Sequence, residues 1–410
     1  MKFSDEQRKA ILSDEPFLFL QACAGSGKTR VIVERVKRLI SEGVESCDIL
    51  CLTFTKKASL EMYHRLNGKI EQIYTFHQFC YKKLKELTYY PFDIMDGDDV
   101  SFSPNEILKV SNYKNTLNRT KKPYSYEKYE LYLRENQLKD FDDLLIDYLK
   151  LELKNNYRYI LIDEFQDTNQ LQYEVIKKMI KKNTQVFTVG DPNQSIYRFR
   201  GSNYQIIHQF VNDYQAKILT LSMNYRSTPE ILYHANALIK YNPKRDYLNM
   251  LPYHKEDEPV ESISFKNKTQ ESEYILNAIK QYIYQNRFQT YAILYRHHER
   301  AYHLKYQLYT TDDYTLMLHQ NVDLLTIHQA KGLEFDFVCL IGLEQGELPS
   351  THENQAFELE EERRLCFVGM TRAKKKLILT HVTSDDSGNI YTPSVFLRES
   401  RVKTHDYILI

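Results

Sequence analysis

The sequence contains no tryptophan, few cysteines and no excess of either charge. Lys and Arg together number 55, as do Asp and Glu, so no net field attracts the chain to nucleic acid or to an anionic membrane. Any DNA binding therefore requires a local groove. The six cysteines include no Cys-x-x-Cys pair, which disfavours a zinc site and is typical of a reducing compartment.

Hydrophobic runs long enough to cross a bilayer are also missing, and the first ten residues, MKFSDEQRKA, lack the apolar core of a signal peptide. Hydrophobic residues make up 42% and charged residues 27% of the chain. This composition is ordinary for a globular protein and disfavours the disordered, collagen and coiled-coil classes. We therefore expect a soluble, cytoplasmic protein with no membrane contact, associated with the nucleoid if the host is bacterial.

The length of 410 residues is too great for one compact core and predicts at least two domains. Nine short apolar runs alternate with helical patterns, which is typical of βαβ units and of parallel sheets covered on both faces. The expected strands are Phe17–Leu20, Ile49–Phe54, Tyr159–Ile162, Val186–Val189, Ile218–Leu221, Tyr291–Tyr295, Leu324–Ile327, Phe337–Ile341 and Lys376–Thr380. We expect the first sheet to end near Asn212 and the second to begin near Gln215.

A glycine-containing turn follows the first expected strand. It consists of Ala22, Cys23, Ala24, Gly25, Ser26, Gly27, Lys28 and Thr29, and a helical pattern begins at Val31. Such a turn aims backbone N–H groups and the positive end of a helix at phosphate oxygens. Lys28 is then expected to reach the β- and γ-phosphates of ATP, and Thr29 to bind Mg²⁺. The strict signature has Gly where this chain has Ala22.

The second half of an ATPase site is expected at the end of a later buried strand. The segment Tyr159–Ile162 is followed directly by Asp163 and Glu164. Asp163 is expected to hold Mg²⁺, directly or through water, and Glu164 to deprotonate the attacking water. An Asp-Glu pair at a strand end also serves as a helix cap, but its partnership with the upstream turn favours an ATPase.

Nine sequence blocks together resemble the superfamily 1 DNA helicases of the UvrD/Rep/PcrA type. They are FSDEQRKAI, ACAGSGKTR, LTFTKKASLEM, IYTFHQF, YILIDEFQDTNQLQ, VGDPNQSIYRFRGS, LSMNYRS, LLTIHQAKGLEFDFV and RRLCFVGMTRAKKKL, in the family's order. The resemblance implies an α/β fold of two RecA-like parallel-sheet domains, with ATP hydrolysed in the cleft between them. It places the first domain at 1–84 and 141–214, a small helical insertion at 85–140, and the second domain at 215–410.

For ATP, the resemblance implies roles for eight further residues. Gln7 reads the adenine, Arg30 and Tyr225 flank the base, Gln194 senses the γ-phosphate, Arg226 and Arg372 are arginine fingers, and Gly332 and Glu334 close over the ribose and triphosphate. Positive charge over the transferred phosphoryl group is worth about 10³–10⁵ in rate. Two structural alternatives stay open, because Ser4 and Gln7 also form a capping-box pattern and either arginine also suits a surface ion pair.

For DNA, the resemblance implies six contact residues. Phe54, Tyr197 and Phe199 match positions that stack on single-strand bases, whereas Thr75, His77 and His328 match positions that contact the DNA backbone. A base–aromatic stack is worth about 1–3 kcal/mol and tolerates any base. The family usually has Trp where this chain has Phe199, so the grip there is expected to be weaker. A single Thr or His is also often a satisfied structural group.

The chain departs from the family in its accessory regions. The second large insertion of full-length relatives would fall between Thr310 and Asn321, where only twelve residues are available. We therefore expect the second RecA-like domain to lack it. The resulting motor is expected to be either unrestrained as a monomer or dependent on a protein partner to engage duplex DNA.

The resulting hypothesis is an ATP- and Mg²⁺-dependent helicase that moves 3′ to 5′ on single-stranded DNA and acts at duplex junctions. Two alternatives remain: a DNA-dependent ATPase that translocates and strips proteins without unwinding alone, and a nucleotide-gated module that regulates a partner complex. An RNA motor is less favoured by the resemblance. The sequence leaves the pathway open between replication, repair, recombination and defence.

Overall fold

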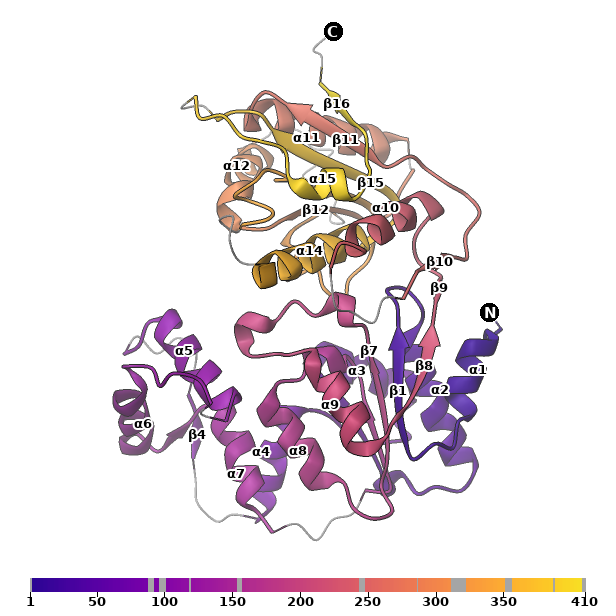
Figure 1. The fold of residues 1–410 in the computed structure, drawn as a ribbon, viewed down its shortest axis with the longest axis vertical. Helices are drawn as coiled ribbons and strands as arrows, with labels where there is room; N and C mark the ends of the chain where they lie inside the picture. Colours follow the sequence, from indigo (N-terminus) through magenta and orange to yellow (C-terminus); the bar gives the residue numbers. More distant parts are fainter. Residues whose placement is uncertain are drawn as a thin grey trace. The chain divides into compact units, whose positions relative to one another are not determined.

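The computed structural model describes residues 2–87, 92–95, 101–117, 119–152, 157–242, 248–285, 287–310, 322–350, 356–385 and 388–407. The chain divides into two compact units (Figure 1). Unit 1 comprises Met1–Ala22 and Gly27–Leu221, and unit 2 comprises Cys23–Ser26 and Ser222–Ile410. Within the described ranges, the helices are too short or too polar to cross a membrane.

Unit 1 contains a parallel sheet of six strands in the order β3-β2-β6-β7-β1-β8. The strands are β1 (Phe17–Ala22), β2 (Ile49–Thr53), β3 (Ile73–Thr75), β6 (Tyr159–Ile162), β7 (Gln185–Gly190) and β8 (Lys217–Leu221). One face is covered by α1 (Asp5–Leu12), α2 (Lys28–Ser41) and α3 (Lys56–Arg65). The other is covered by α4 (Phe76–Leu87), α7 (Phe141–Lys150), α8 (Gln170–Met179) and α9 (Gln205–Tyr214).

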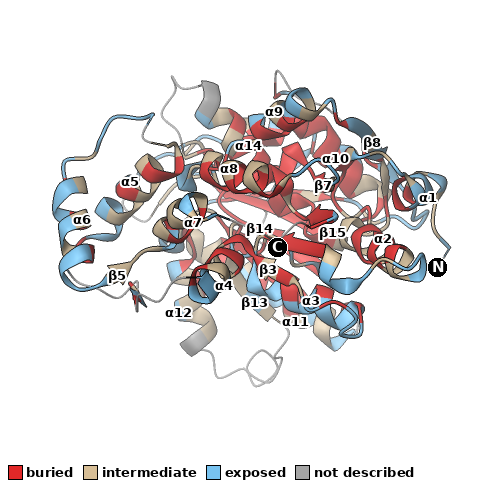
Figure 2. Ribbon diagram, turned by 90° about the horizontal axis from the view of Figure 1, so that it is seen from below, coloured by how far each residue is buried: buried red, intermediate tan, exposed pale blue. Residues whose placement is uncertain are grey.

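Alternation along the strands explains why both faces are covered. On β2, Leu50 and Leu52 belong to the core beneath α4 and α7, whereas Ile49 and Cys51 belong to the core beneath α2 and α3. Successive side chains of a strand point to opposite faces, so a strand that is apolar throughout must be covered twice. The central strand β7 is accordingly coloured as buried in Figure 2.

The stretch expected as a helical insertion carries α5 (Pro104–Asn115), α6 (Tyr126–Glu135) and a two-stranded ribbon of β4 (Asp93–Ile94) and β5 (Leu138–Lys139). It lies at one side of unit 1, beside α7 and away from α1 (Figure 1). Its own small core consists of Met95, Phe102, Val110, Tyr129 and Leu133. A capping box of Ser103 and Glu106 begins α5.

Unit 2 contains a second parallel sheet of six strands, in the order β13-β12-β14-β15-β11-β16. The strands are β11 (Glu261–Phe265), β12 (Tyr291–Tyr295), β13 (Val322–Thr326), β14 (Phe335–Leu340), β15 (Ala373–Val382) and β16 (Thr404–Asp406). The helices are α10 (Pro229–Ile239), α11 (Lys268–Tyr284), α12 (Tyr302–Thr310), α14 (Ala356–Met370) and α15 (Val395–Glu399). When the six strands of each sheet are numbered one to six in chain order, both sheets have the order 3-2-4-5-1-6.

Short elements connect these layers. The parallel pair β9 (Met223–Asn224) and β10 (Leu251–Pro252) belongs to unit 2. The 3₁₀ turns are η1 (Ser46–Asp48), η2 (Phe165–Asp167), η3 (Pro192–Gln194), η4 (Arg198–Arg200) and η5 (His298–Ala301). Three of them, η2, η3 and η4, follow the carboxyl ends of β6 and β7 and carry residues of the candidate site.

Two expectations about the sheets differ from the structure or fall outside it. The strand at 217–221 was expected in the second sheet, but β8 pairs with β1 in the first. The reason is local: only Gln215 and Ala216 separate α9 from β8, so the chain returns to the sheet that α9 covers. The expected absence of an insertion at Thr310–Asn321 falls on 311–321, which lie outside the described residues.

A buried ion cluster ties together three parts of unit 2. The Arg300 guanidinium donates to both oxygens of Glu344, at 3.0 and 3.2 Å, and contacts both oxygens of Glu271, at 2.7 and 2.9 Å. All three residues are less than 5% exposed. Val382 N–H on β15 donates to Glu344 at 2.7 Å, which ties this cluster to the sheet. Because the cation faces two carboxylates, its removal leaves buried negative charge without compensation.

We therefore expect Arg300→Ala to lower the free energy of unfolding of unit 2 by about 3–5 kcal/mol. Urea unfolding followed by circular dichroism measures this loss. The matched control is Arg398→Ala, because Arg398 is exposed on α15 and such surface changes stay within about 0.5 kcal/mol. Equal stability of the two variants would contradict a stabilising role for the cluster.

Candidate nucleotide and nucleic-acid sites

The turn between β1 and α2 is shaped for an anion. Gly27 is the N-cap of α2 with φ +83°, a conformation that residues with a Cβ rarely adopt. The Lys28 ammonium donates to the carbonyl oxygen of Ala22 at 3.4 Å, across the mouth of the turn. The positive end of a helix and a lysine thus face the same small volume, an arrangement that binds phosphate.

Asp163 lies beside Thr29 although 134 positions separate them in sequence. The Thr29 hydroxyl donates to Asp163 Oδ2 at 3.2 Å, and Asp163 Oδ1 accepts from the Glu164 N–H at 2.9 Å. A hydroxyl and a carboxylate are the oxygen ligands that Mg²⁺ takes together with substrate phosphates, so these two residues fit the ion. Burial, and then the charge of Glu164, raise the pKa of Asp163 to about 7, against the opposing effect of Lys28.

Glu164 occupies a left-handed backbone conformation, with φ +50° and ψ +42°. A residue with a Cβ rarely adopts this conformation, and such strain clusters at functional sites. Gln166 and Asp191, which the sequence analysis did not single out, complete the surroundings. Gln166 donates to the Glu164 carboxylate and accepts from Asp191 N–H at 3.0 Å, while Gln194 donates to Asp191 Oδ2 at 2.7 Å.

Gln166 and Asp191 are both at most 2% exposed, and burial raises the pKa of Asp191. They form a polar chain from Glu164 to Gln194 at the carboxyl ends of β6 and β7. Sequence spacing does not reveal this chain. Both residues lie inside matching blocks, but their burial and their contacts become visible only in the structure.

Gln7 has the structural role that the sequence analysis left open. Its amide oxygen accepts from Ser4 N–H at 3.1 Å, and Ser4 Oγ accepts from Gln7 N–H at 3.2 Å, which completes a capping box at α1. A Cβ on Gly27 would lie 3.1 Å from the Gln7 amide nitrogen. The Arg30 guanidinium lies 4.2 Å from the ring centroid of Phe3. Gln7 and Gly27, at opposite ends of β1 in sequence, therefore lie together in unit 1.

In unit 2, Asn224 organises the segment Cys23–Ser26. Its amide nitrogen donates to Ala24 O at 2.7 Å, and Tyr225 N–H donates to Gly25 O at 2.9 Å. The Asn224 side-chain oxygen accepts from the N–H groups of residues 226 and 227, both at 2.8 Å, and the residue is fully buried. The sequence analysis missed Asn224, although it lies inside one of the matching blocks.

The remaining expected ATP residues of unit 2 lie close to one another. Arg226 Nε donates to Glu334 at 2.8 Å, and its Nη1 donates to Thr371 O at 3.1 Å. Arg372 is 1% exposed and donates to Val368 O and Leu333 O, at 2.9 and 3.2 Å. Gly332 has φ +84°, a conformation favoured by glycine, next to Leu333. Residues from three separate blocks therefore converge within unit 2.

Three aromatic residues and an arginine form an aromatic cluster in unit 1. The rings of Phe54 and Tyr197 are stacked, with centroids 5.4 Å apart and planes 20° apart. Phe199, which is 42% exposed, lies 6.1 Å from Tyr197. The Arg200 guanidinium lies 5.8 Å from the Tyr197 ring and 5.5 Å from the Phe199 ring. One exposed and two half-buried rings beside a guanidinium suit bases and phosphates of a single strand.

A cavity of about 570 Å³ adjoins this cluster. Phe54, Tyr197 and Arg200 line one part of it, His77 lines another, and residues of α5 line a third. Thr75 is not among its lining residues, because it is 8% exposed and its hydroxyl accepts from Gln78 N–H at 3.2 Å. Two of the three expected stacking residues and His77 thus meet at one cavity.

The sequence Thr-x-His-Gln occurs once in each unit, with the same geometry. Thr75 N–H donates to Gln78 Oε1 at 3.0 Å, and Thr326 N–H donates to Gln329 Oε1 at 3.0 Å. In each unit the glutamine N–H returns a hydrogen bond to the threonine hydroxyl at 3.2 Å. Each Thr ends the third strand of its sheet, so His77 and His328 occupy equivalent positions.

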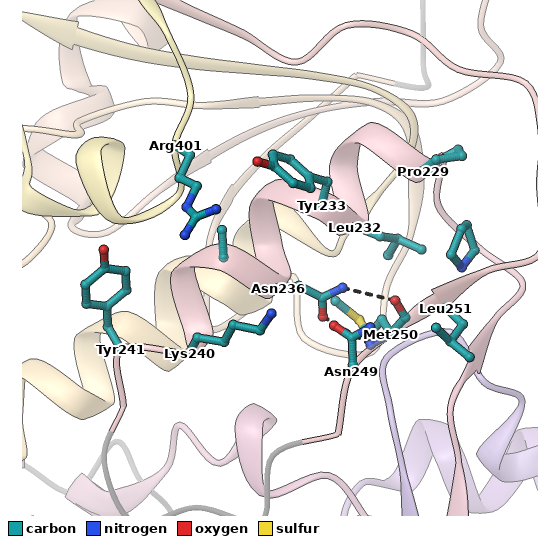
Figure 3. Close-up of a pocket in the computed structure, with 12 residues that line it drawn as sticks. Pro229, Leu232, Tyr233, Asn236, Lys240, Tyr241, Asn249, Met250, Leu251 and Arg401 are labelled. Carbon is teal, nitrogen blue, oxygen red and sulfur yellow. Dashed lines mark hydrogen bonds between the residues drawn. The ribbon is translucent and has the colours of Figure 1, made fainter.

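A second cavity, of about 600 Å³, lies in unit 2 between α10 and the segment Asn249–Pro252. Tyr233, Lys240 and Arg401 line it, and Asn236 donates to Met250 O at 3.0 Å beneath it (Figure 3). None of the residues expected at the ATP or DNA site lines this cavity.

Family comparisons agree with this geometry along most of the chain. A model described as the UvrD/REP helicase N-terminal domain matches residues 3–94 and 94–215. A model described as the UvrD-like helicase C-terminal domain matches residues 219–312 and 310–384. The chain belongs to the UvrD/REP helicase family. Membership accounts for two parallel-sheet units that carry the nine blocks in order.

Individual relatives differ in how much of their length is matched. A protein named "Probable DNA helicase" from Mycoplasma pneumoniae is 32% identical over 459 aligned residues, which cover 96% of this chain and 86% of the relative. "DNA helicase II" of Haemophilus influenzae is 30% identical over 73% of this chain, and "ATP-dependent DNA helicase PcrA" of Staphylococcus epidermidis 31% over 72%. The chain spans about half the length of the latter two, 49% and 48%.

His77, which lines the 570 Å³ cavity, provides a test of pH dependence. Burial lowers the pKa of His77 from 6.5 to about 4, with the Asp140 charge opposing the shift. Below pH 6.5 the unfolded chain therefore takes up a proton that the folded protein does not, so stability contributed by neutral His77 is lost as the pH falls.

We expect the free energy of unfolding to decrease more steeply for the wild type than for His77→Gln when the pH is lowered from 6.5 towards 4. Urea unfolding at several pH values measures both slopes. Parallel slopes would show that His77 titrates normally in the folded protein.

Proposed function

We propose that this chain hydrolyses ATP to move along single-stranded DNA in the 3′-to-5′ direction and to separate duplex DNA at junctions. The observation that carries the proposal is the pairing of Thr29 with Asp163 beside Lys28, in a member of a helicase family. The direction is supported by the family resemblance alone.

On the ATP side, each residue would have a defined task. Lys28 and the N–H groups of the 22–29 turn would hold the β- and γ-phosphates, while Thr29 and Asp163 would hold Mg²⁺. The bound ion would supply a positive charge that neutralises the phosphates. Glu164 would take the proton of the attacking water, with Gln166 fixing its carboxylate.

The arginines of unit 2 would respond to nucleotide. Arg226 now pairs with Glu334 and with a carbonyl oxygen, and Arg372 is satisfied by carbonyl oxygens. For either guanidinium to act as an arginine finger, it must exchange these partners for phosphate oxygens. In the proposed mechanism, this exchange would take place when ATP binds and the cleft between the two RecA-like domains closes.

On the DNA side, the aromatic cluster would bind the bases of the single strand by stacking. Each base stacked on an aromatic ring is worth about 1–3 kcal/mol, and a DNA base-pair step averages about 1.4 kcal/mol. Two rings are therefore enough to hold one separated nucleotide against re-pairing. DNA as substrate also supports a cytoplasmic location.

A second function, translocation that strips proteins without unwinding alone, is favoured by the short segment at 310–321. The two matched parts of the C-terminal family model meet at residues 310–312. A chain without a large insertion there would depend on a protein partner to engage the duplex.

We expect Glu164→Gln to reduce ATP turnover at least about a hundredfold without loss of fold, because the amide cannot accept the proton of water. Steady-state hydrolysis in the presence of oligo(dT) measures turnover, and circular dichroism monitors the fold. Glu61→Gln on the exposed face of α3 is the control. Turnover that persists in Glu164→Gln would exclude its role as the general base.

We further expect single-stranded DNA to stimulate hydrolysis and the protein to unwind a 3′-tailed duplex, but not a 5′-tailed one. Displacement of streptavidin from a biotinylated single strand is measured in parallel. Unwinding establishes the helicase, whereas streptavidin displacement without unwinding establishes the translocase. An ATP hydrolysis rate that does not change when single-stranded DNA is added would contradict both functions.

A further inference from the structure

The helical insertion contacts the aromatic cluster through one face of α5. Asn112 Nδ2 donates to the carbonyl oxygen of Phe199 at 2.8 Å, in the turn η4 that carries Phe199 and Arg200. Gly201, which ends this turn with φ +79°, packs so tightly on α5 that an added Cβ would lie 3.1 Å from Asn115 Cβ. The backbone that carries Phe199, one of the expected DNA contacts, and Arg200 therefore rests on the insertion.

A second asparagine extends the contact towards the ATP side of unit 1. Asn115 Oδ1 accepts from Asn169 Nδ2 at 2.8 Å, and Asn115 is 4% exposed. Asn169 caps α8, because its side-chain oxygen accepts from Gln172 N–H at 2.8 Å. It ends the segment that begins with Asp163 and Glu164.

The same segment also touches the residues that follow η4. Thr168 O accepts from Asn203 N–H at 3.2 Å, and Asn169 pairs with Ser202 in an isolated antiparallel bridge. The 163–169 segment, the 197–203 segment and α5 therefore meet at Asn115. The 570 Å³ cavity next to the aromatic cluster is lined by all three.

We propose that Asn112 and Asn115 are positioning residues for single-stranded DNA. Asn112 fixes the backbone of Phe199, so that the rings and Arg200 are arranged before DNA binds. Asn115 connects this arrangement to the segment of Asp163 and Glu164, so that DNA binding alters hydrolysis. The inference rests on the proposed function, since it assigns the small insertion a part in DNA binding and in the coupling of DNA binding to ATP hydrolysis.

The two residues are expected to differ in kinetic effect. Asn112→Ala removes one hydrogen bond from the turn and should raise the oligo(dT) concentration for half-maximal stimulation about threefold to tenfold. Asn115→Ala breaks the link to Asn169 and should lower the maximal DNA-stimulated rate. Hydrolysis without DNA should fall less than the DNA-stimulated rate in both variants, because neither residue contacts Lys28 or Asp163 in the described structure.

The experiment measures ATP hydrolysis against oligo(dT) concentration for the wild type, Asn112→Ala, Asn115→Ala and the control Asn105→Ala. Asn105 lies on the same helix and is exposed. The fluorescence of a single 2-aminopurine within oligo(dT), at saturating protein, reports base stacking on the aromatic cluster. Urea unfolding of each variant records any loss of stability.

The expected result is weaker quenching of 2-aminopurine in saturated Asn112→Ala, with wild-type behaviour of Asn105→Ala. Unchanged quenching and unchanged half-maximal concentration would overturn the proposal. So would a loss of activity that merely follows the fraction of unfolded protein, because a purely stabilising role does not alter the bound base. A wild type that does not respond to DNA would instead refute the proposed function itself.

Discussion

A parallel sheet brings the carboxyl ends of all its strands to one edge, and the chemistry of this chain depends on that constraint. In unit 1, Lys28 and Thr29 come after β1, Asp163 follows β6, and Gln194 follows β7. These strands are neighbours in the order β6-β7-β1, so residues more than a hundred positions apart in sequence lie within hydrogen-bonding range. Coverage of both faces by helices keeps the strands fixed. It also leaves the strand ends as the positions where polar groups can gather.

Burial at this edge carries an electrostatic cost. Asp163 is 5% exposed, next to a second carboxylate, and its pKa is raised to about 7. A divalent cation offsets such a cost, because it supplies the positive charge that water no longer provides. The left-handed backbone of Glu164 adds strain at the same place. The strand edge thus holds buried charge and backbone strain that the apolar core lacks, and a bound nucleotide with its ion would relieve part of this cost.

Much of this arrangement could be predicted from the sequence, for physical reasons that also mark the limits. Continuous apolar runs such as Tyr159–Ile162 and Tyr291–Tyr295 became strands with the expected bounds, since only a doubly covered strand needs apolar residues at every position. Short or polar strands were missed: β3 has three residues, and β11 contains Glu261 and two serines. The sheet that β8 joins could not be predicted, because an apolar run does not specify its partner. Within the site, Asn224, Gln166 and Asp191 were missed because their roles arise from contacts rather than from spacing.

The Thr-x-His-Gln turns are a structural feature that the two units have in common. Both sheets have the order 3-2-4-5-1-6, and both end their third strand with the same pair of threonine–glutamine hydrogen bonds. The two units therefore repeat one topology and one turn, although their polar residues differ: unit 1 carries Lys28, Asp163 and Glu164, and unit 2 carries Arg226 and Arg372. The repeated turn also makes His77 and His328 structurally equivalent, so each unit holds a histidine at the same end of its sheet.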